Sequence, residues 1–174
     1  MGIATSFGQA FAKAQQAADN GLPMQGAILL TVNDRDKEAT APIARRFHEM
    51  GYTLYATAGT ARFLGARGIP VERVFKVHEG RPHCIDLIVN GQVQLLVNTP
   101  LGKAAQTDDY TMRKAAIARR VPYTTTLSAA SAAGDAVLAL RSREVSVRSL
   151  QEWHEMLSAA PTAVAAAAYG ASRV

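Results

Sequence analysis

Four short polar segments of this chain stand at the ends of apolar runs, and their side chains suit an anion. They are Asp36-Lys37, Thr57-Ala-Gly-Thr60, Lys76 and Asn98-Thr99. The carboxyl ends of parallel strands meet at one edge of a sheet, where ligands bind. If these segments end neighbouring strands, together they form a site for a small anion, and a phosphate fits their donors best.

The segment Thr57-Ala-Gly-Thr60 predicts the start of a helix with Thr57 as its N-cap. Backbone N–H groups of a first helical turn have no helical partner and, with the helix dipole, attract an anion. Gly59 lets the backbone approach an oxyanion, and the threonine hydroxyls add donors. An ordinary helix cap explains this pattern more simply when it is taken alone. Lys37 and Lys76 favour the anion site, because each ammonium stands beside a strand end.

Strand and helix patterns alternate through most of the sequence. Continuous apolar runs are typical of strands buried on both faces, and apolar residues three and four positions apart predict helices. We place Pro42 in the first turn of its helix, since a proline deeper inside would disrupt it. The alternation predicts an α/β fold, with one open, mainly parallel five-stranded sheet and helices on both faces, in a Rossmann- or flavodoxin-like three-layer arrangement. The expected strands are 26–32, 52–56, 71–77, 93–97 and 122–126, and the expected helices are 6–18, one ending at Gly51, 57–64, 83–89, 108–120 capped by Thr107, one capped by Ser128 and ending at 140, and 147–157.

The composition indicates a folded globular protein with a modest positive charge. Of 174 residues, 48% are apolar, and 19 Lys and Arg against 14 Asp and Glu give a net charge of +5. This excess suits an anionic ligand, although a solvated basic surface explains it equally well. The basic residues are scattered and only 6% of residues are aromatic, which does not favour nucleic acid. Without a visible signal peptide or an apolar run of roughly 20 residues, we expect a cytoplasmic protein without membrane contact.

The sequence lacks the common signatures of catalysis. It has no Gly-x-Gly-x-x-Gly fingerprint, no Gly-x-x-x-x-Gly-Lys-Ser/Thr loop and no Gly-x-Ser-x-Gly elbow. The histidines lack metal-ligand spacing, and the nearest carboxylates, Glu79 and Asp86, do not form an obvious acid/base pair. The single cysteine, Cys84, falls in an apolar helical pattern and is interpreted as a buried small hydrophobe. We therefore predict no catalytic residue and no metal site.

Several segments, taken in order, resemble one family. They are Asp36-Lys37, Ala56-Thr-Ala-Gly-Thr60, Lys76-Val-His-Glu-Gly-Arg-Pro-His83, Asn98-Thr99, Arg113-Lys114-Ala-Ala and Val121-Pro-Tyr-Thr-Thr-Thr-Leu127. Their order and spacing resemble the methylglyoxal-synthase-like domain that ends the large chain of carbamoyl-phosphate synthase. The resemblance implies three parts: residues 1–23 as a helix and linker left from a preceding ATP-grasp region, residues 24–158 as the allosteric domain, and residues 159–174 as an alanine-rich, disordered tail.

In that family the domain is regulatory and binds nucleotide monophosphates, with UMP as inhibitor and IMP as activator. The resemblance assigns the effector's phosphate to Lys37, Thr57, Thr60 and Lys76, beside Gly59. It assigns the ribose and base to Thr31, Asn98 and Thr99. It assigns ornithine to Tyr123 and Thr125, at the boundary with the preceding region. The sequence departs from the family pattern at Ala58 and Pro100, so it leaves open which base is preferred.

The parent enzyme makes carbamoyl phosphate for arginine and pyrimidine biosynthesis from glutamine-derived ammonia, bicarbonate and ATP, with Mg or Mn. Its ATP-grasp units are absent from this sequence, so the resemblance implies a non-catalytic fragment without a cofactor of its own. The implied partners are the rest of the large chain, through it the glutaminase small subunit, and a second copy of this chain. The alternative is a methylglyoxal synthase, which eliminates phosphate from a triose phosphate. The Gly-rich, aspartate-bearing stretch of that enzyme is not seen from Lys76 to His83.

Overall fold

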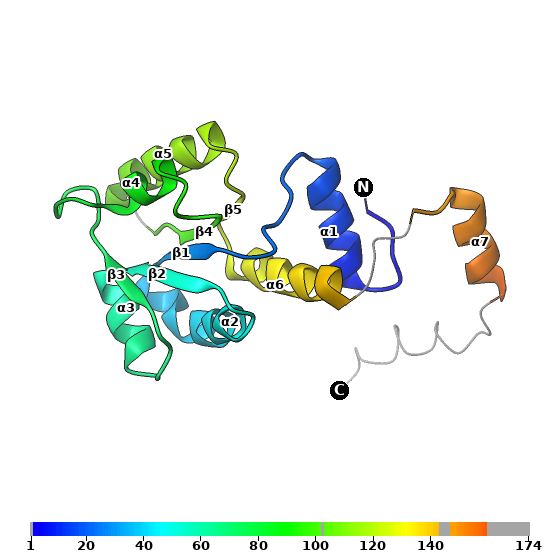
Figure 1. Ribbon diagram of the computed structural model, residues 1–174, viewed down its shortest axis with the longest axis horizontal. Helices are drawn as coiled ribbons and strands as arrows, with labels where there is room; N and C mark the ends of the chain where they lie inside the picture. The colour runs from blue at the N-terminus through cyan, green and yellow to red at the C-terminus, as the bar shows by residue number, and fades with distance from the viewer. Residues whose placement is uncertain (1, 102, 143–146, 160–174) are drawn as a thin grey trace. The chain divides into compact units, whose positions relative to one another are not determined.

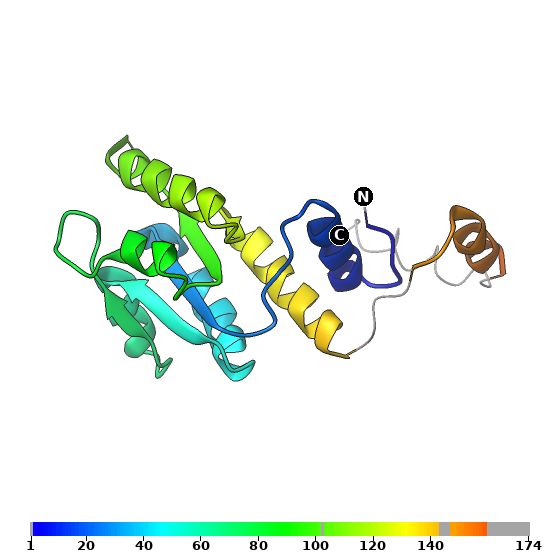
Figure 2. The same cartoon turned by 45° about the horizontal axis from the view of Figure 1, so that its top comes forward.

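The computed structural model describes residues 2–101, 103–142 and 147–159, and the chain divides at residue 143 into two compact units. The first unit contains a five-stranded parallel sheet between two layers of helices (Figure 1; Figure 2), which confirms the predicted α/β fold. The elements are α1 (Phe7–Ala17), β1 (Ala27–Val32), η1 (Asp34–Asp36), α2 (Lys37–Glu49), β2 (Thr53–Thr57), α3 (Ala58–Gly65), β3 (Glu72–Val74), α4 (Cys84–Val89), β4 (Leu95–Thr99), α5 (Lys103–Ala118), β5 (Tyr123–Thr124), α6 (Leu127–Ser142) and α7 (Leu150–Ala159).

The strand order of the sheet is β3-β2-β1-β4-β5, and all neighbouring strands are parallel. From β1 the chain builds outward through β2 and β3, and then places β4 and β5 on the other side of β1. The connection order therefore reverses between β1 and β4, where Thr31 is in register with Asn98 and Val32 with Thr99. In open parallel sheets, ligands bind beyond the carboxyl ends of the strands at such a reversal.

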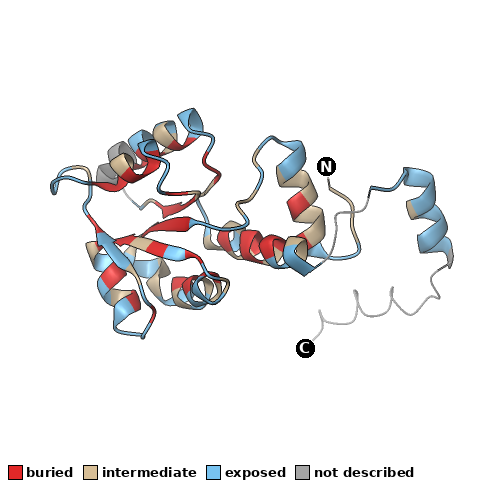
Figure 3. Cartoon of the chain, viewed as in Figure 1, coloured by how far each residue is buried: buried red, intermediate tan, exposed pale blue. Residues whose placement is uncertain are grey.

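Different helices cover the two faces of the sheet. On β1, Ile28 and Leu30 pack with α2, α3 and α6, whereas Leu29 between them packs with α4 and α5. Figure 3 shows the buried residues along the sheet and on the helix sides that face it. Cys84 belongs to the second cluster and is 2% exposed, which confirms its interpretation as a buried small hydrophobe.

Pro42 lies inside α2 and not in its first turn, so that prediction is wrong. The helix begins early because Asn33 caps the turn directly after β1. Its Oδ1 accepts two backbone N–H groups of the following turn, at 2.9 and 3.2 Å, and starts η1, which continues into α2 at Lys37. Pro42 cannot donate to the carbonyl of Glu38, a solvent-exposed residue of the first turn, so water can take the place of that hydrogen bond. Lys37 is consequently the first residue of the helix.

Two further helices also begin earlier than predicted. α5 starts at Lys103, so Thr107 lies within the helix and does not cap it. The Lys-Ala-Ala sequence at its start consists of good helix formers, which extend the helix back towards the preceding loop. At α6, the hydroxyl of Thr126 accepts a backbone N–H of the first turn at 3.2 Å and takes the capping role predicted for Ser128.

Two strands are shorter than predicted. β3 ends at Val74, because the backbone then leaves the sheet and only an isolated bridge joins Phe75 to His83. Lys76 therefore stands on the loop that follows β3. β5 ends at Thr124, since Thr126 already caps α6.

The N-terminal helix α1 packs against α6, and the two backbones come close at Gly8. Ser6 caps α1 by accepting the N–H of Gln9, and Gly8 and Ala12 are buried. A Cβ added to Gly8 would lie 2.6 Å from the carbonyl oxygen of Asp135 in α6. α1 thus belongs to the same compact unit as the sheet. Its origin in a preceding ATP-grasp region stays a prediction.

The second unit contains α7, which starts at Leu150 and not at 147. Ser149 Oγ accepts the N–H of Glu152 at 3.2 Å, and the Glu152 carboxylate accepts the N–H of Ser149 at 2.6 Å, which makes a capping box. Ala159 ends this helix, and the rest of the predicted tail lies outside the described residues. Within the described ranges, every helix is too short or too polar to cross a membrane.

We predict that Gly8→Ala lowers the free energy of unfolding by about 1–3 kcal/mol, because the new methyl group overpacks the contact with the α6 backbone. Gly65→Ala is the matched control, since this helical glycine has nothing within 4 Å of an added Cβ. There the higher helix propensity of alanine should leave stability equal or slightly greater. Urea unfolding measures both variants, and equal free energies would contradict the close approach of α1 to α6.

Candidate functional site

A cavity of about 460 Å³ opens at the carboxyl ends of β1 and β4. After β1 the backbone continues on the face of the sheet that α2 covers, and after β4 it continues on the face that α5 covers. The carboxyl ends of these two strands are therefore covered by neither connection. The volume is within the range of small-molecule sites. Five predicted site residues line the cavity: Thr31, Thr57, Lys76, Asn98 and Thr99.

The ammonium of Lys37 reaches the first turn of α3. A Cβ added to Gly59 would lie 3.1 Å from Lys37 Nζ, so any larger residue there would crowd the ammonium. Thr57 is the N-cap of α3 as predicted, but its side chain makes no capping hydrogen bond. Thr57 is also the last residue of β2, and it lines the cavity. The Thr60 hydroxyl donates to the Val32 carbonyl at 3.5 Å, which ties α3 to the end of β1.

Asp34 connects the ammonium of Lys37 to the cavity. Its Oδ1 is 2.5 Å from Lys37 Nζ, and it lines the cavity together with Lys76. The hydrogen bond from Lys37, and then the charge of Lys37, lower the pKa of the Asp34 carboxyl below its usual value, and the charge of Lys76 lowers this pKa slightly further. Lys37 therefore lies close to the start of α3 and to a carboxylate of the cavity wall, and the charge of Lys76 reaches the same carboxylate.

Asn33 joins the end of β1 to the end of β4. Its Nδ2 donates to the Asp36 carboxylate at 2.7 Å, and to the Thr99 carbonyl and hydroxyl at 3.1 Å each. The Asn33 backbone N–H also donates to the Thr99 hydroxyl, at 3.3 Å. Because the Thr99 oxygen accepts both bonds, its own O–H is left to donate to another group.

A buried series of hydrogen bonds fixes the amide of Asn98 beside the cavity. The Thr31 hydroxyl donates to Asn98 Oδ1, Asn98 Nδ2 donates to Asp109 Oδ1, and Arg113 donates to Asp109 Oδ2, each at 2.5 Å. Asp109 is only 7% exposed, and Arg113, one helical turn further on, balances its charge. The orientation leaves one N–H and one carbonyl lone pair of Asn98 for a ligand.

Apolar side chains complete the wall of the cavity. Cys84 and Met112 are buried in it, and Pro100 and the half-exposed Leu101 line it further out. Such surfaces suit the flat faces of a base or the carbon skeleton of a sugar. Pro100, one of the two departures from the family pattern, is therefore a lining residue. Ala58, the other, is the first residue of α3.

The two residues predicted to hold ornithine lie apart from this cavity. Tyr123 and Thr125 line a second cavity of about 200 Å³, which residues of α1 and of the following linker also line. The hydroxyl of Thr124 in its wall is buried and has no hydrogen-bond partner among the described residues. A buried hydroxyl costs free energy unless it is bonded, so this cavity offers a polar group to a ligand or a water molecule.

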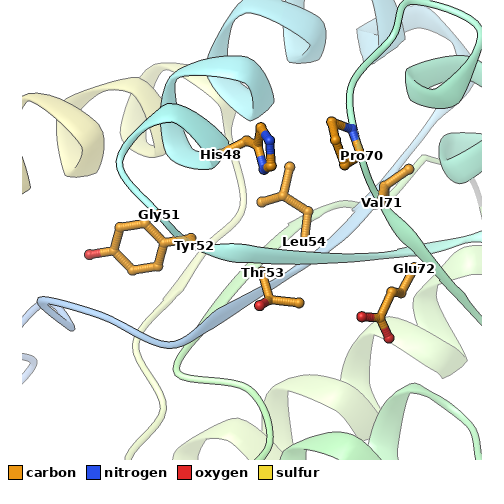
Figure 4. A pocket seen from close by; sticks show the side chains of 8 residues that line it. All are labelled: His48, Gly51, Tyr52, Thr53, Leu54, Pro70, Val71 and Glu72. Carbon is orange, nitrogen blue, oxygen red and sulfur yellow. The ribbon is translucent and has the colours of Figure 1, made fainter.

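A third cavity, of about 270 Å³, lies at the opposite edge of the sheet, where β2 begins. Leu54 points there towards His48 and Pro70, whereas the side chains of Thr53 and Glu72, which also line the cavity, point to the other side of the strands (Figure 4). It contains none of the predicted site residues.

Glu79 and Asp86, the carboxylates that the sequence offered as candidates for an acid/base pair, accept hydrogen bonds that close turns of the backbone. Glu79 accepts the N–H of Lys76 at 3.1 Å, and Asp86 forms a capping box with His83 at the start of α4. Over the part of the sequence that the structure describes, no three His, Cys, Asp or Glu side chains come close enough together to hold a metal ion.

Three polar residues were not predicted from the sequence: Asn33 and Asp34, which line the cavity, and Asp109, which bonds to Asn98 from behind it. Asn33 and Asp34 had a usable signal, because an Asn-Asp pair directly after an apolar run is typical of a helix cap. Asp109 had none, since no sequence spacing indicates that α5 brings its carboxylate to the side chain of Asn98 on β4.

Comparison with known proteins identifies the family of the fold. The model of the MGS-like domain family matches residues 39–125, which is half of the chain. A methylglyoxal synthase from Elizabethkingia anophelis has a similar structure, with a TM-score of 0.54 over 77% of this protein and 93% of that one. The two sequences are 16% identical, so this likeness concerns the fold alone.

Relatives with higher sequence identity are large chains of carbamoyl phosphate synthase. That of Gemmatimonas aurantiaca is 59% identical over 99% of this sequence, and the arginine-specific chloroplastic large chain of Arabidopsis thaliana is 43% identical over 90%. The C-terminal section of the large chain from Methanopyrus kandleri is 45% identical over 89%. The matched region spans only 16%, 13% and 29% of these three relatives.

We predict that Asp109→Ala lowers the free energy of unfolding by about 1–3 kcal/mol, because it leaves the buried amide of Asn98 and the guanidinium of Arg113 without their acceptor. Glu49→Ala removes the same charge from an exposed position and is the control, with an expected change within about 0.5 kcal/mol. Thermal and urea unfolding measure both. A loss no larger than that of the control would show that the buried series of hydrogen bonds does not contribute to stability.

Proposed function

The chain belongs to the MGS-like domain family, and on this premise we propose that it is the effector-binding part of a carbamoyl-phosphate synthase large chain. The ligands that we propose are nucleoside monophosphates, UMP as inhibitor and IMP as activator. The observation that carries the proposal is that Lys37 lies against Gly59 in the first turn of α3 and pairs with Asp34, which lines the cavity together with Lys76. The large-chain relatives support it, because they match nearly the whole of this sequence.

The phosphate lies at the mouth of the cavity in this proposal. Lys37 and Lys76 supply two positive charges, and the N–H groups of the first turn of α3 donate to the phosphate oxygens. Gly59 is required here, because its missing side chain leaves room for the Lys37 ammonium. Thr57 adds a hydroxyl that is not used for capping, and Thr60 fixes the turn through its bond to Val32.

The nucleoside lies deeper, along the ends of β1 and β4. Thr31, Asn98 and Thr99 supply its polar contacts, with the Asn98 amide oriented by Asp109. The apolar wall formed by Pro100 and its neighbours covers the base or the sugar. Because these walls offer shape more than paired donors and acceptors, the binding free energy comes chiefly from the phosphate.

Ornithine occupies the second cavity in this proposal, beside Tyr123 and Thr125. Its ammonium groups need carboxylates, and the described residues that line this cavity include none. They would come from the preceding ATP-grasp region of the large chain. The same proposal makes this protein non-catalytic and cytoplasmic, with ATP and Mg or Mn bound elsewhere in the parent enzyme. Its partners are the rest of the large chain, the glutaminase small subunit, and a second copy of itself.

Calorimetric titration with UMP and IMP tests this function. We expect micromolar binding to the wild type, and at least about a hundredfold weaker binding to the Lys37→Ala, Lys76→Ala double variant, because each charge-assisted contact contributes about 1.5–3 kcal/mol. The charge-matched control is the Lys13→Ala, Arg119→Ala double variant, whose positions in α1 and after α5 do not line the cavity. If neither nucleotide binds the wild type, or if the two double variants bind equally, the proposal fails.

The enzyme alternative makes a different prediction. A methylglyoxal synthase needs a general base beside a bound triose phosphate. Among the described lining residues the carboxylate is that of Asp34, which is paired with Lys37. We therefore expect no phosphate release from dihydroxyacetone phosphate above the buffer rate. Steady release that stops in Asp34→Asn would establish the alternative.

A further inference from the structure

Asp34 places a negative charge where the proposed ligand's phosphate would lie. Its carboxylate is 2.5 Å from Lys37 Nζ, and that ammonium in turn lies against Gly59 at the start of α3. The Asp34 side chain is 92% exposed, whereas that of Lys37 is 18% exposed. The lysine is thus held by its surroundings, and the aspartate can rotate into solvent.

We propose that Asp34 is a specificity-determining residue: its carboxylate is the internal counterion of Lys37, and a ligand must displace it to bind. The inference rests on the proposed function and deepens it. It assigns to the site a preference for dianionic phosphate monoesters over monoanions.

The preference follows from the charges that are exchanged. A monoanionic ligand replaces one negative charge beside Lys37 with another and gains little. A dianion satisfies Lys37 and Lys76 together, so its binding outweighs the loss of the internal ion pair. An exposed ion pair of this kind shifts an equilibrium by up to about fivefold, which sets the size of the expected effect.

Asp34 remains ionised over the pH range that separates the two ligand forms. Its pKa is lowered first by the hydrogen bond from Lys37 and then by the charges of Lys37 and Lys76, so the carboxyl stays charged at pH 5. A phosphate monoester loses its second proton near pH 6. Between pH 7.5 and pH 5.0 the ligand therefore changes from dianion to monoanion while the competing carboxylate does not change.

Other ionisable groups near the site are common to the proteins to be compared. Lys37 begins α2, Lys76 follows β3, and Asp36 is bonded to Asn33. On the other face, Asp109 is paired with Arg113 in α5. His78 lies on the loop after Lys76, and His83 caps α4. Any change in the protonation of these groups affects the wild type and an Asp34 variant alike, and so cancels in a ratio of affinities.

Two other roles for Asp34 would each give a different result. If the carboxylate accepted a hydroxyl of the ribose, its replacement by an amide would weaken nucleotide binding. If Asp34 served only to start α2, Asn would replace it without effect on binding, since Asn is an equally good residue at a helix start.

The experiment measures UMP binding by calorimetry at pH 7.5 and pH 5.0 for the wild type, Asp34→Asn and Glu38→Gln. Glu38 also forms an exposed 2.5 Å ion pair, with Arg67, so Glu38→Gln makes the same change of charge one residue beyond Lys37. We expect Asp34→Asn to bind UMP about two- to fivefold more tightly than Glu38→Gln at pH 7.5. We also expect the affinity of Asp34→Asn for UMP to fall less between pH 7.5 and pH 5.0 than the affinity of the wild type falls. Circular dichroism confirms that all three proteins are folded.

The outcomes separate this inference from the function on which it rests. Wild-type binding that Lys37→Ala abolishes, together with equal or weaker binding by Asp34→Asn, overturns the role of Asp34 and leaves the nucleotide site standing. A failure of all folded variants to bind UMP overturns both. Tighter binding by Asp34→Asn with an unchanged pH ratio supports the counterion but overturns the preference for dianions.

Discussion

The reversal of strand order between β1 and β4 is the constraint on which the rest of the site depends. Because the backbone leaves these neighbouring strands towards opposite faces of the sheet, their carboxyl ends are covered by neither connection. The parallel register then places Thr31 opposite Asn98, and Asn33 reaches Thr99 with its side chain. The polar edge of the cavity is therefore a consequence of topology, and the surrounding elements add charge to it.

The positive charge comes from elements that flank the reversal. Lys37 begins α2, Lys76 follows β3, and both act on the mouth of the cavity near Gly59. A positive charge beside the cavity is stabilised by a neighbouring anion. Asp34 supplies that anion from the same turn that carries Lys37. Lys37 is thus paired without a ligand, and in the proposed function the same carboxylate competes with the phosphate for this lysine.

The fold and most of the cavity could be predicted from the sequence, since both depend on strong local patterns. Apolar runs predicted all five strands, and the rule that parallel strands end at one edge predicted that Thr57, Lys76, Asn98 and Thr99 would lie together. Thr31, which also lines the cavity, was assigned only through the family resemblance. The predicted roles of these residues in binding stay predictions.

The errors arose where one side chain overrides a pattern. Asn33 starts a helical turn before Lys37 and so places Pro42 inside α2, and Thr126 takes the cap from Ser128. The contact between Asn98 and Asp109 depends on how far α5 extends and how it packs on β4. No periodicity of the sequence contains that information.

The proposed effector function requires that ligand binding be transmitted to the rest of an enzyme, and the packing around α2 offers a physical basis for this. α2 begins at the cavity with Lys37 and, three turns later, Arg46 donates to Asp135 at 2.9 Å and to the Ser131 carbonyl at 2.7 Å, both in α6. Gly8 of α1 packs against the backbone of the same Asp135. A ligand couples to a distant part only if it shifts an element that has two discrete arrangements. Close-packed helices meet this requirement better than loops do, because a contact without free space cannot deform gradually and must slip as a unit. If a phosphate binds at Lys37 as proposed, the contacts of α2 with α6, and of α6 with the N-terminal helix, are the route by which it would act on the rest of the unit.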